Sequence, residues 1–190
     1  MTQDFTGWRW INEPAKWSAG TLGTEEDDLV VTADARTDLW RVTHYGFTYD
    51  TAHLFGTTVT GDARVTTTFR APWAAQYDQA GAMIRIDEKN WIKAGVEYVD
   101  GQLNVSAVVT RDVSDWSVAP ALGPAETITV DLAREGDTVT VRYGLDGAEP
   151  VTMLRLAYFP PGVPALAGVM CAAPQGNGFE VRFTNISVSS

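Results

Sequence analysis

Polar side chains that could bind a ligand alternate along two predicted strands: Gln79, Arg85, Lys93 and Glu97. Their amide, guanidinium, ammonium and carboxylate groups can hydrogen bond to the hydroxyls of a sugar. Trp91 begins the second strand, where its ring can face the flat C–H surface of a sugar. Gly81 and Gly95 lie between the polar positions, and glycine inside a strand allows another backbone or a ligand to approach closely. The pattern predicts a saccharide groove with a glycine floor.

The same residues have a second interpretation. Lys93 and Glu97 share one face of a strand, and Arg85 can reach either of them. A surface ion pair worth less than about 1 kcal/mol therefore explains the charges equally well. Gly81 and Gly95 can likewise mark strand curvature. Both interpretations stay open.

The hairpin that must position these side chains is defined by its turn. Asp100-Gly101 is typical of a two-residue type I′ turn, which places Val99 opposite Gln102. Counting outward predicts four further pairs: Tyr98 with Leu103, Val96 with Val105, Ala94 with Ala107 and Ile92 with Val109. These apolar pairs mark the core face, so odd-numbered residues from 91 to 97 point to the other side. Pairing with the preceding strand then requires an odd loop or a bulge near Asp87–Asn90.

Short alternating segments recur along the chain, separated by turns rich in Gly and Asp. The predicted strands are Leu29–Ala33, His53–Thr60, Ala63–Arg70, Gln79–Ile86, Trp91–Val99, Gln102–Thr110, Glu126–Leu132, Thr138–Leu145, Val151–Ala157, Ala165–Ala172 and Phe179–Val188. Many short strands at near-regular spacing are typical of an antiparallel sandwich or barrel. We expect one all-β domain over residues 1–190.

Charge and hydropathy exclude several partners. The net charge is −10 and the 14 basic residues are scattered, so the chain repels a phosphate backbone and we expect no nucleic-acid partner. No apolar stretch reaches the roughly 20 residues of a membrane-spanning helix, so we expect no membrane partner. The first residues lack the basic and apolar regions of a secretory signal. We expect a cytoplasmic location.

Five ordered motifs carry a resemblance to a known family: Thr37-Asp38-Leu39-Trp40, Tyr77-Asp78-Gln79-Ala80-Gly81, Trp91-Ile92-Lys93-Ala94-Gly95-Val96-Glu97, Val108-Val109-Thr110 and Ser114-Asp115-Trp116. From about Trp8 to Phe183 the chain resembles the concanavalin A-like proteins of unassigned function typified by the fungal regulation of enolase protein. The resemblance implies a jelly-roll sandwich of two curved antiparallel sheets, with ligands on the concave sheet. It implies no established catalytic mechanism.

Five further residues are predicted to form the rim of the groove: Asp38, Trp40, His53, Asp115 and Trp116. Trp40 and Trp116 each follow an aspartate after a turn-like stretch, so we expect them on loops above the concave sheet, where they could form sugar platforms. His53 begins a strand and could line the groove or serve a structural role. Trp8, Trp10 and Trp17 are interpreted as packing in an N-terminal edge hairpin.

Catalytic patterns are sparse. Concanavalin A-like glucanases carry an E-x-D-x-x-E pattern, which this sequence lacks. Trp91–Glu97 looks similar to the Y-x-K-A-G-x-Y motif of alginate-type lyases, but Trp91 and Glu97 replace its two tyrosines. Glu97 could still form a glycosidase pair with Asp38, Asp78 or Asp115, because such enzymes need two carboxylates about 5–10 Å apart.

Metal and cofactor motifs are also lacking. Cys171 is the only cysteine and lies in an apolar run, so we expect a buried, inert thiol. We expect no cofactor, although loop carbonyls and aspartates leave room for one structural calcium ion.

The sequence is therefore compatible with three functions. The first is a lectin-like domain that binds a saccharide or a small sugar-like ligand without established catalysis. The second is a glycan-active enzyme, a glycoside hydrolase or lyase-like protein, with Glu97 as acid or base. The third is a regulatory domain of sugar metabolism that binds a protein partner.

Overall fold

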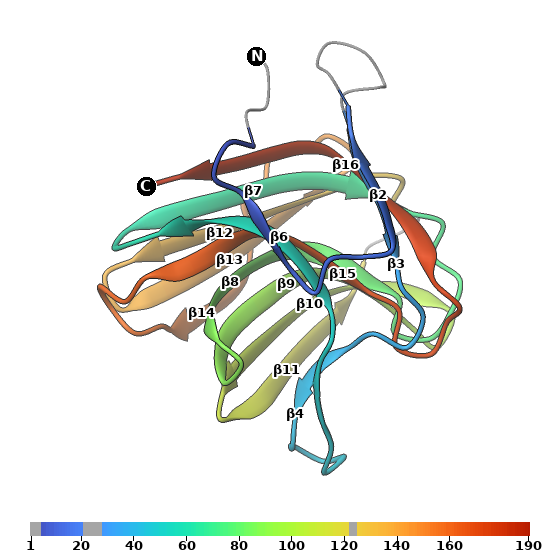
Figure 1. The fold of residues 1–190 in the computed structure, drawn as a ribbon, viewed down its shortest axis with the longest axis horizontal. Coiled ribbons are helices and arrows are strands. Elements are labelled where there is room, and N and C mark those ends of the chain that lie inside the picture. Colours follow the sequence, from blue (N-terminus) through green and yellow to red (C-terminus); the bar gives the residue numbers. More distant parts are fainter. Residues whose placement is uncertain (1–4, 21–27, 122–124) are drawn as a thin grey trace.

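The computed structural model describes residues 5–20, 28–121 and 125–190. Within these ranges the chain forms sixteen strands and no helix. Two seven-stranded sheets, which we call sheet A and sheet B, lie face to face (Figure 1). All pairs of neighbouring strands in them are antiparallel. The predicted antiparallel sandwich is confirmed.

Each sheet contains strands from the beginning, the middle and the end of the sequence. In spatial order, sheet A contains β1 (Arg9–Ile11), β6 (His53–Val59), β15 (Ala165–Ala172), β8 (Gln79–Asp87), β9 (Asn90–Val99), β10 (Gln102–Arg111) and β11 (Val113–Pro120). Sheet B contains β14 (Thr152–Tyr158), β13 (Thr138–Leu145), β12 (Ile128–Glu135), β7 (Ala63–Arg70), β16 (Phe179–Ser189), β3 (Leu29–Ala33) and β2 (Lys16–Ala19). A separate hairpin pairs β4 (Leu39–Arg41) with β5 (Thr48–Asp50).

The predicted register of β9 and β10 is confirmed at every pair. Val99 lies opposite Gln102, and Ile92 lies opposite Val109. Asp100 and Gly101 have φ values of 52° and 76°, as a type I′ turn requires. The register of β8 against β9 shifts between Arg85 and Asp87, which is the predicted bulge. Because side chains alternate along a strand, this register determines which residues of β9 face sheet B.

The main hydrophobic core fills the space between the sheets. Sheet A contributes even-numbered residues of β8 and β9, including Ala82, Ile92 and Val96, and sheet B contributes residues such as Val65 and Leu132. Cys171 is buried in this core, and its burial raises the pKa of the thiol. The thiol therefore stays protonated at neutral pH, as an inert buried cysteine does.

A second, smaller core lies on the outer face of sheet A, the face directed away from sheet B. Leu39 and Trp40 of the β4–β5 hairpin pack there against Met83, Trp91 and Met170. Hydrogen bonds from Arg41 hold the hairpin to the start of β11: its backbone N–H donates to Ser114 Oγ at 2.9 Å and its Nε to the Asp112 carbonyl at 3.1 Å. The hairpin projects beside β11 at the foot of Figure 1. It therefore covers one part of the outer face and leaves the rest open.

Two predictions about local structure are wrong. The tryptophan-rich N-terminal segment does not form a hairpin, because β1 pairs with β6 in sheet A and β2 pairs with β3 in sheet B. The predicted edge packing does occur: Trp10 and Trp17 both pack on Phe55, with ring centroids 4.7 and 5.7 Å away. Trp40 lies in β4 and Trp116 in β11, so neither is on a loop.

Glycine at positions 81 and 95 is required by the approach of two strands. Gly81 and Gly95 lie opposite each other in β8 and β9. A Cβ atom on Gly81 would lie 2.1 Å from the Ala94 carbonyl oxygen and 2.6 Å from the Gly95 Cα. Of the reasons that the sequence left open, close approach of another backbone therefore accounts for this glycine pair.

We expect Gly81→Ala to destabilise the protein by at least about 3 kcal/mol, because the added methyl group must displace the backbone of β9. The matched variant Gly101→Ala adds the same methyl group where no atom lies within 4 Å. Gly101→Ala should therefore lose only about 1 kcal/mol of stability, the cost of placing an alanine at a left-handed backbone position. Urea denaturation of both variants measures the difference. Equal losses of stability would contradict this explanation of the glycine pair.

Candidate functional site

The open part of the outer face forms a cleft of about 560 Å³ between the β4–β5 hairpin and sheet A. The strands of sheet A provide a polar floor, and the hairpin provides an aromatic wall. The residues that line the cleft are Arg36, Asp38, Trp40, Tyr45, Phe47, Tyr49, Tyr77, Gln79, Lys93, Glu97, Trp116, Pro174 and Gln175.

Three connected polar side chains form the floor. Lys93, Glu97 and Gln79 are only 4%, 6% and 3% exposed. Lys93 Nζ lies 3.2 Å from Glu97 Oε1 and also donates a hydrogen bond to Gln79 Oε1. The amide nitrogen of Gln79 donates to the Tyr77 carbonyl at 3.3 Å and reaches Asp38 Oδ1 at 3.5 Å. Because these side chains hydrogen bond to one another, the floor is held in one arrangement before any ligand arrives.

The side of the cleft that the hairpin provides is aromatic. Tyr45, Phe47 and Tyr49 follow one another at alternating positions, with centroid distances of 5.3 and 5.0 Å between successive rings. All three residues are more than a third exposed. Trp116 of β11 also lines the cleft, and it donates its indole N–H to Ser106 Oγ at 3.1 Å, which fixes the orientation of its ring. The cleft therefore combines exposed ring surfaces with a fixed polar floor.

The Tyr45 hydroxyl is oriented toward the polar residues of the cleft. Its pKa is raised above the ordinary value because of partial desolvation, a hydrogen bond with Tyr77, and the nearby carboxylates of Glu97 and Asp38. The phenol therefore stays neutral well into the alkaline range and can donate a hydrogen bond.

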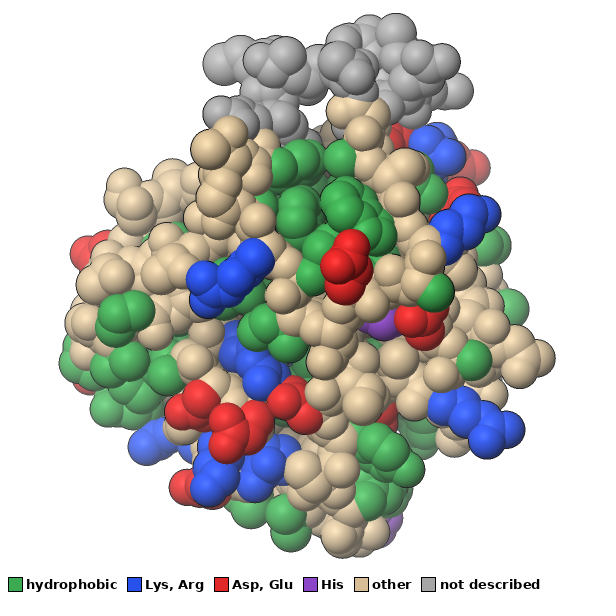
Figure 2. Space-filling model, in the orientation of Figure 1, with side chains coloured by type: hydrophobic (Ala, Val, Ile, Leu, Met, Phe, Trp, Pro, Cys, Tyr) green, Lys and Arg blue, Asp and Glu red, His purple; other side chains and the backbone are tan. Residues whose placement is uncertain are grey.

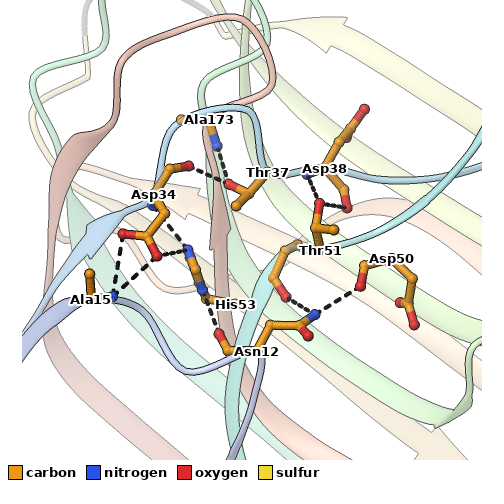
Figure 3. A network of polar contacts seen from close by, with 10 residues as sticks. Asn12, Ala15, Asp34, Thr37, Asp38, Asp50, Thr51, His53 and Ala173 are labelled. Atoms are coloured by element: carbon orange, nitrogen blue, oxygen red, sulfur yellow. Dashed lines mark hydrogen bonds and ion pairs between the residues drawn. The ribbon is translucent and has the colours of Figure 1, made fainter.

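The structure brings six of the predicted site residues together in this cleft: Asp38, Trp40, Gln79, Lys93, Glu97 and Trp116. Asp38 comes from the loop before β4. Its backbone N–H donates to Thr51 Oγ1 at 2.9 Å, and its carbonyl accepts from the backbone N–H groups of Thr51 and Ala52. This anchoring, part of which is drawn in Figure 3, holds the Asp38 side chain at the edge of the cleft.

Arg85 and Trp91 share the outer face with the cleft residues but do not line the cleft, which corrects their predicted position. The guanidinium of Arg85 forms a two-point ion pair with the Asp50 carboxylate, with Nη2 2.8 Å from Oδ2. Trp91 is fully buried in the second core. The hairpin packs over both residues, and this long-range contact has no local sequence signal.

His53 and Asp115 also lie outside the cleft, which corrects their predicted place on its rim. Figure 3 shows His53 between Asp34 and Asn12. Its Nε2 accepts the Asp34 backbone N–H at 3.0 Å, so its Nδ1 donates to the Asn12 carbonyl at 2.5 Å. This is a structural histidine with both nitrogens occupied. Asp115 instead pairs with Arg155 of β14, with Oδ2 3.0 Å from Nη2, because it points away from its neighbour Trp116.

The glycine pair does not form the predicted floor of the cleft. Neither Gly81 nor Gly95 lines it, and Gly95 borders only a small recess of about 10 Å³ together with Lys93, Glu97 and Ser106. Such a recess is about the size of one water molecule. The side chains of Gln79, Lys93 and Glu97 form the floor instead.

Sequence reasoning missed seven cleft residues: Arg36, Tyr45, Phe47, Tyr49, Tyr77, Pro174 and Gln175. The alternation of Tyr45, Phe47 and Tyr49 was a usable signal, because period-two aromatics are typical of a strand with one shared face. Tyr77 belongs to a motif that carried the family resemblance. Arg36, Pro174 and Gln175 had no signal, since a parallel bridge between Ala35 and Ala173 brings their two loops together.

The described part of the chain has neither a metal-binding cluster nor a membrane-spanning helix. Among residues 5–20, 28–121 and 125–190, no three His, Cys, Asp or Glu side chains are grouped so as to hold a metal ion. The expected absence of a cofactor and the possible calcium ion stay predictions. The same ranges contain no helix long and apolar enough to cross a membrane.

Comparison with known proteins identifies relatives along nearly the whole chain. A family model described as "Protein of unknown function (DUF1349)" matches residues 10–190. Regulation of enolase protein 1 of Saccharomyces cerevisiae is 32% identical over 181 residues, which cover 95% of this chain and 88% of the yeast protein. A crystal structure of a functionally unknown S. cerevisiae protein has a TM-score of 0.88 at 31% identity, covering 99% of this chain and 98% of that one.

A more distant structure is similar in fold alone. The carbohydrate-binding module CBM66 from Bacillus subtilis has a TM-score of 0.57 at 14% identity, covering 97% of this chain and 96% of the module. The fold is the jelly-roll sandwich that the sequence resemblance implied, and the resemblance to the fungal family is likewise confirmed.

We expect Lys93→Met to destabilise the protein by about 3 kcal/mol, because it leaves the Glu97 carboxylate buried without its ion-pair partner. The double variant Lys93→Met/Glu97→Leu removes both charges and should recover most of that loss. Chemical denaturation of the single and double variants measures the coupling. Additive losses in the double variant would contradict a buried, coupled pair.

Proposed function

The chain belongs to this family of proteins of unknown function, and we propose that its cleft binds a saccharide. The observation that carries the proposal is the composition of the cleft, in which an aromatic wall faces a buried polar floor. A sugar has the matching surfaces, with C–H faces that pack on aromatic rings and hydroxyls that both donate and accept hydrogen bonds. A volume of about 560 Å³ lies within the range of small-molecule sites.

Each cleft residue has a defined part in this proposal. The rings of Tyr45, Phe47 and Trp116 contact the faces of the sugar. Glu97 accepts hydrogen bonds from ligand hydroxyls, and Lys93 donates to them. The carbohydrate-binding module of Bacillus subtilis, named for this activity, has the same fold, which supports the assignment.

A glycosidase is the second candidate, because Asp38 and Glu97 both line the cleft and such enzymes use two carboxylates. The other predicted partners of Glu97 are less suited. Asp78 is buried and accepts the Ala75 backbone N–H at 2.9 Å, and Asp115 lies elsewhere. Glu97 Oε1 is also engaged by Lys93. We therefore place binding ahead of catalysis.

The test is a glycan array followed by calorimetry on the strongest saccharide. We expect the wild-type protein to bind and to release no shorter product. Trp116→Ala should weaken binding at least tenfold. Removing an aromatic contact and the area that it buries costs more than about 1.4 kcal/mol of binding free energy, which corresponds to a factor of ten. Glu97→Gln keeps the shape of the floor and tests the carboxylate. Glu180→Gln on sheet B is the matched control and should leave binding unchanged.

Three results would contradict the proposal. Product release that Glu97→Gln abolishes would favour the glycosidase. Failure to bind any saccharide, together with specific binding of a protein partner, would favour the regulatory interaction domain. Saccharide binding that neither Trp116→Ala nor Glu97→Gln weakens would place the site elsewhere on the molecule.

A further inference from the structure

Most charged side chains of the cleft have a polar partner, but one of them has none among the residues that the structure describes. Lys93 is 3.2 Å from Glu97, and Asp38 Oδ1 accepts the Leu39 backbone N–H at 2.7 Å. Arg36 differs from them, because within the part of the chain that the structure describes its guanidinium has neither an acidic partner nor a hydrogen-bond acceptor. The cleft therefore contains one exposed cation whose charge is not neutralised locally.

Arg36 is held at the cleft in a conformation that an arginine rarely adopts. Its φ is 61°, in the left-handed region, which costs a residue with a side chain about 1–2 kcal/mol. Its backbone N–H donates to the Ala173 carbonyl at 2.8 Å, and the adjacent Thr37 Oγ1 accepts the Ala173 N–H at 3.0 Å. Part of this anchoring is visible in Figure 3.

Backbone strain of this kind recurs around the cleft. Tyr77, which also lines it, has a φ of 67°, and Val42 and His44 at the tip of the hairpin have φ values of 63° and 65°. Strained residues persist only where the surrounding structure holds them, and they gather at functional sites. Glycine would remove the strain at position 36, so the arginine side chain itself has a use there.

We infer that Arg36 makes the cleft selective for a saccharide that carries an anionic group, a carboxylate or a phosphate. This inference rests on the proposed function. A guanidinium group binds either anion through two parallel N–H donors. On the face shown in Figure 2, acidic and basic side chains are interspersed, and the net charge of −10 repels anions at long range. Recognition of the anion must therefore come from contact with Arg36 itself.

The experiment compares a neutral sugar with two charged forms of the same sugar. Calorimetry at 50 mM and 300 mM salt uses glucose, glucuronate and glucose 6-phosphate, with the galactose and mannose series in parallel. In at least one series we expect a charged form to bind at least tenfold more tightly than the neutral sugar, with the difference reduced at high salt. The uronate and phosphate arms identify which anion is recognised.

Two glycine variants separate recognition from structure. Arg36→Gly should abolish the preference for the charged form, because its affinity for the charged sugar should fall much more than its affinity for the neutral sugar. Because it also relieves the strain, its unfolding midpoint should stay the same or rise by up to about 3 °C. Asp112→Gly is the matched control, since Asp112 has a φ of 60° but lies outside the cleft. Arg70→Gln removes a cation from sheet B and controls for long-range charge.

Each outcome decides the inference. Equal affinity for neutral and charged sugars, or a preference that survives in Arg36→Gly, would overturn it while the proposed function stands. A clear fall in the unfolding midpoint of Arg36→Gly would assign the residue a structural role. Failure of every neutral and charged sugar to bind would overturn the proposed function together with the inference.

Discussion

Strand β9 contributes one face to the core between the sheets and the other face to the floor of the cleft, and the rest of the structure depends on that double role. Ile92, Ala94 and Val96 fill the core between the sheets, whereas Lys93 and Glu97 form the floor of the cleft on the outer face. A slip of one residue would exchange the two sets and bury both charges in an apolar core. The type I′ turn at Asp100 and Gly101 opposes that slip, because both residues must adopt positive φ values in this register.

The β4–β5 hairpin divides the outer face of sheet A into a dry part and an open part. Beneath its base, Leu39 packs with Met83 and Trp91, and the ion pair between Arg85 and Asp50 closes the edge. Beyond the hairpin, the buried polar floor lines the cleft and the exposed rings lie beside it. The aromatic wall is thus a consequence of how the hairpin is anchored, and the cleft exists because the hairpin covers only part of the sheet.

The sequence was sufficient to predict the features that residue alternation and turn type determine. It was not sufficient to predict contacts between segments that are distant in the chain. The register of β9 and β10, the bulge after Arg85 and the face that carries Lys93 and Glu97 all follow from local rules. The burial of Trp91 does not, because it depends on the distant hairpin of β4 and β5, which could have packed elsewhere. Arg36 likewise reaches the cleft only through the pairing of Ala35 with Ala173.

The proposed saccharide site lies between the aromatic hairpin and the floor formed by Gln79, Lys93 and Glu97. The seven tryptophans offer a direct test, because each gives its own indole N–H signal in a ¹H–¹⁵N NMR spectrum. When the protein is titrated with a saccharide that it binds, we expect shifts of the Trp40 and Trp116 signals, because these residues line the cleft, and none for Trp10, Trp17 or Trp73. Shifts confined to those last three signals would contradict this location of the site.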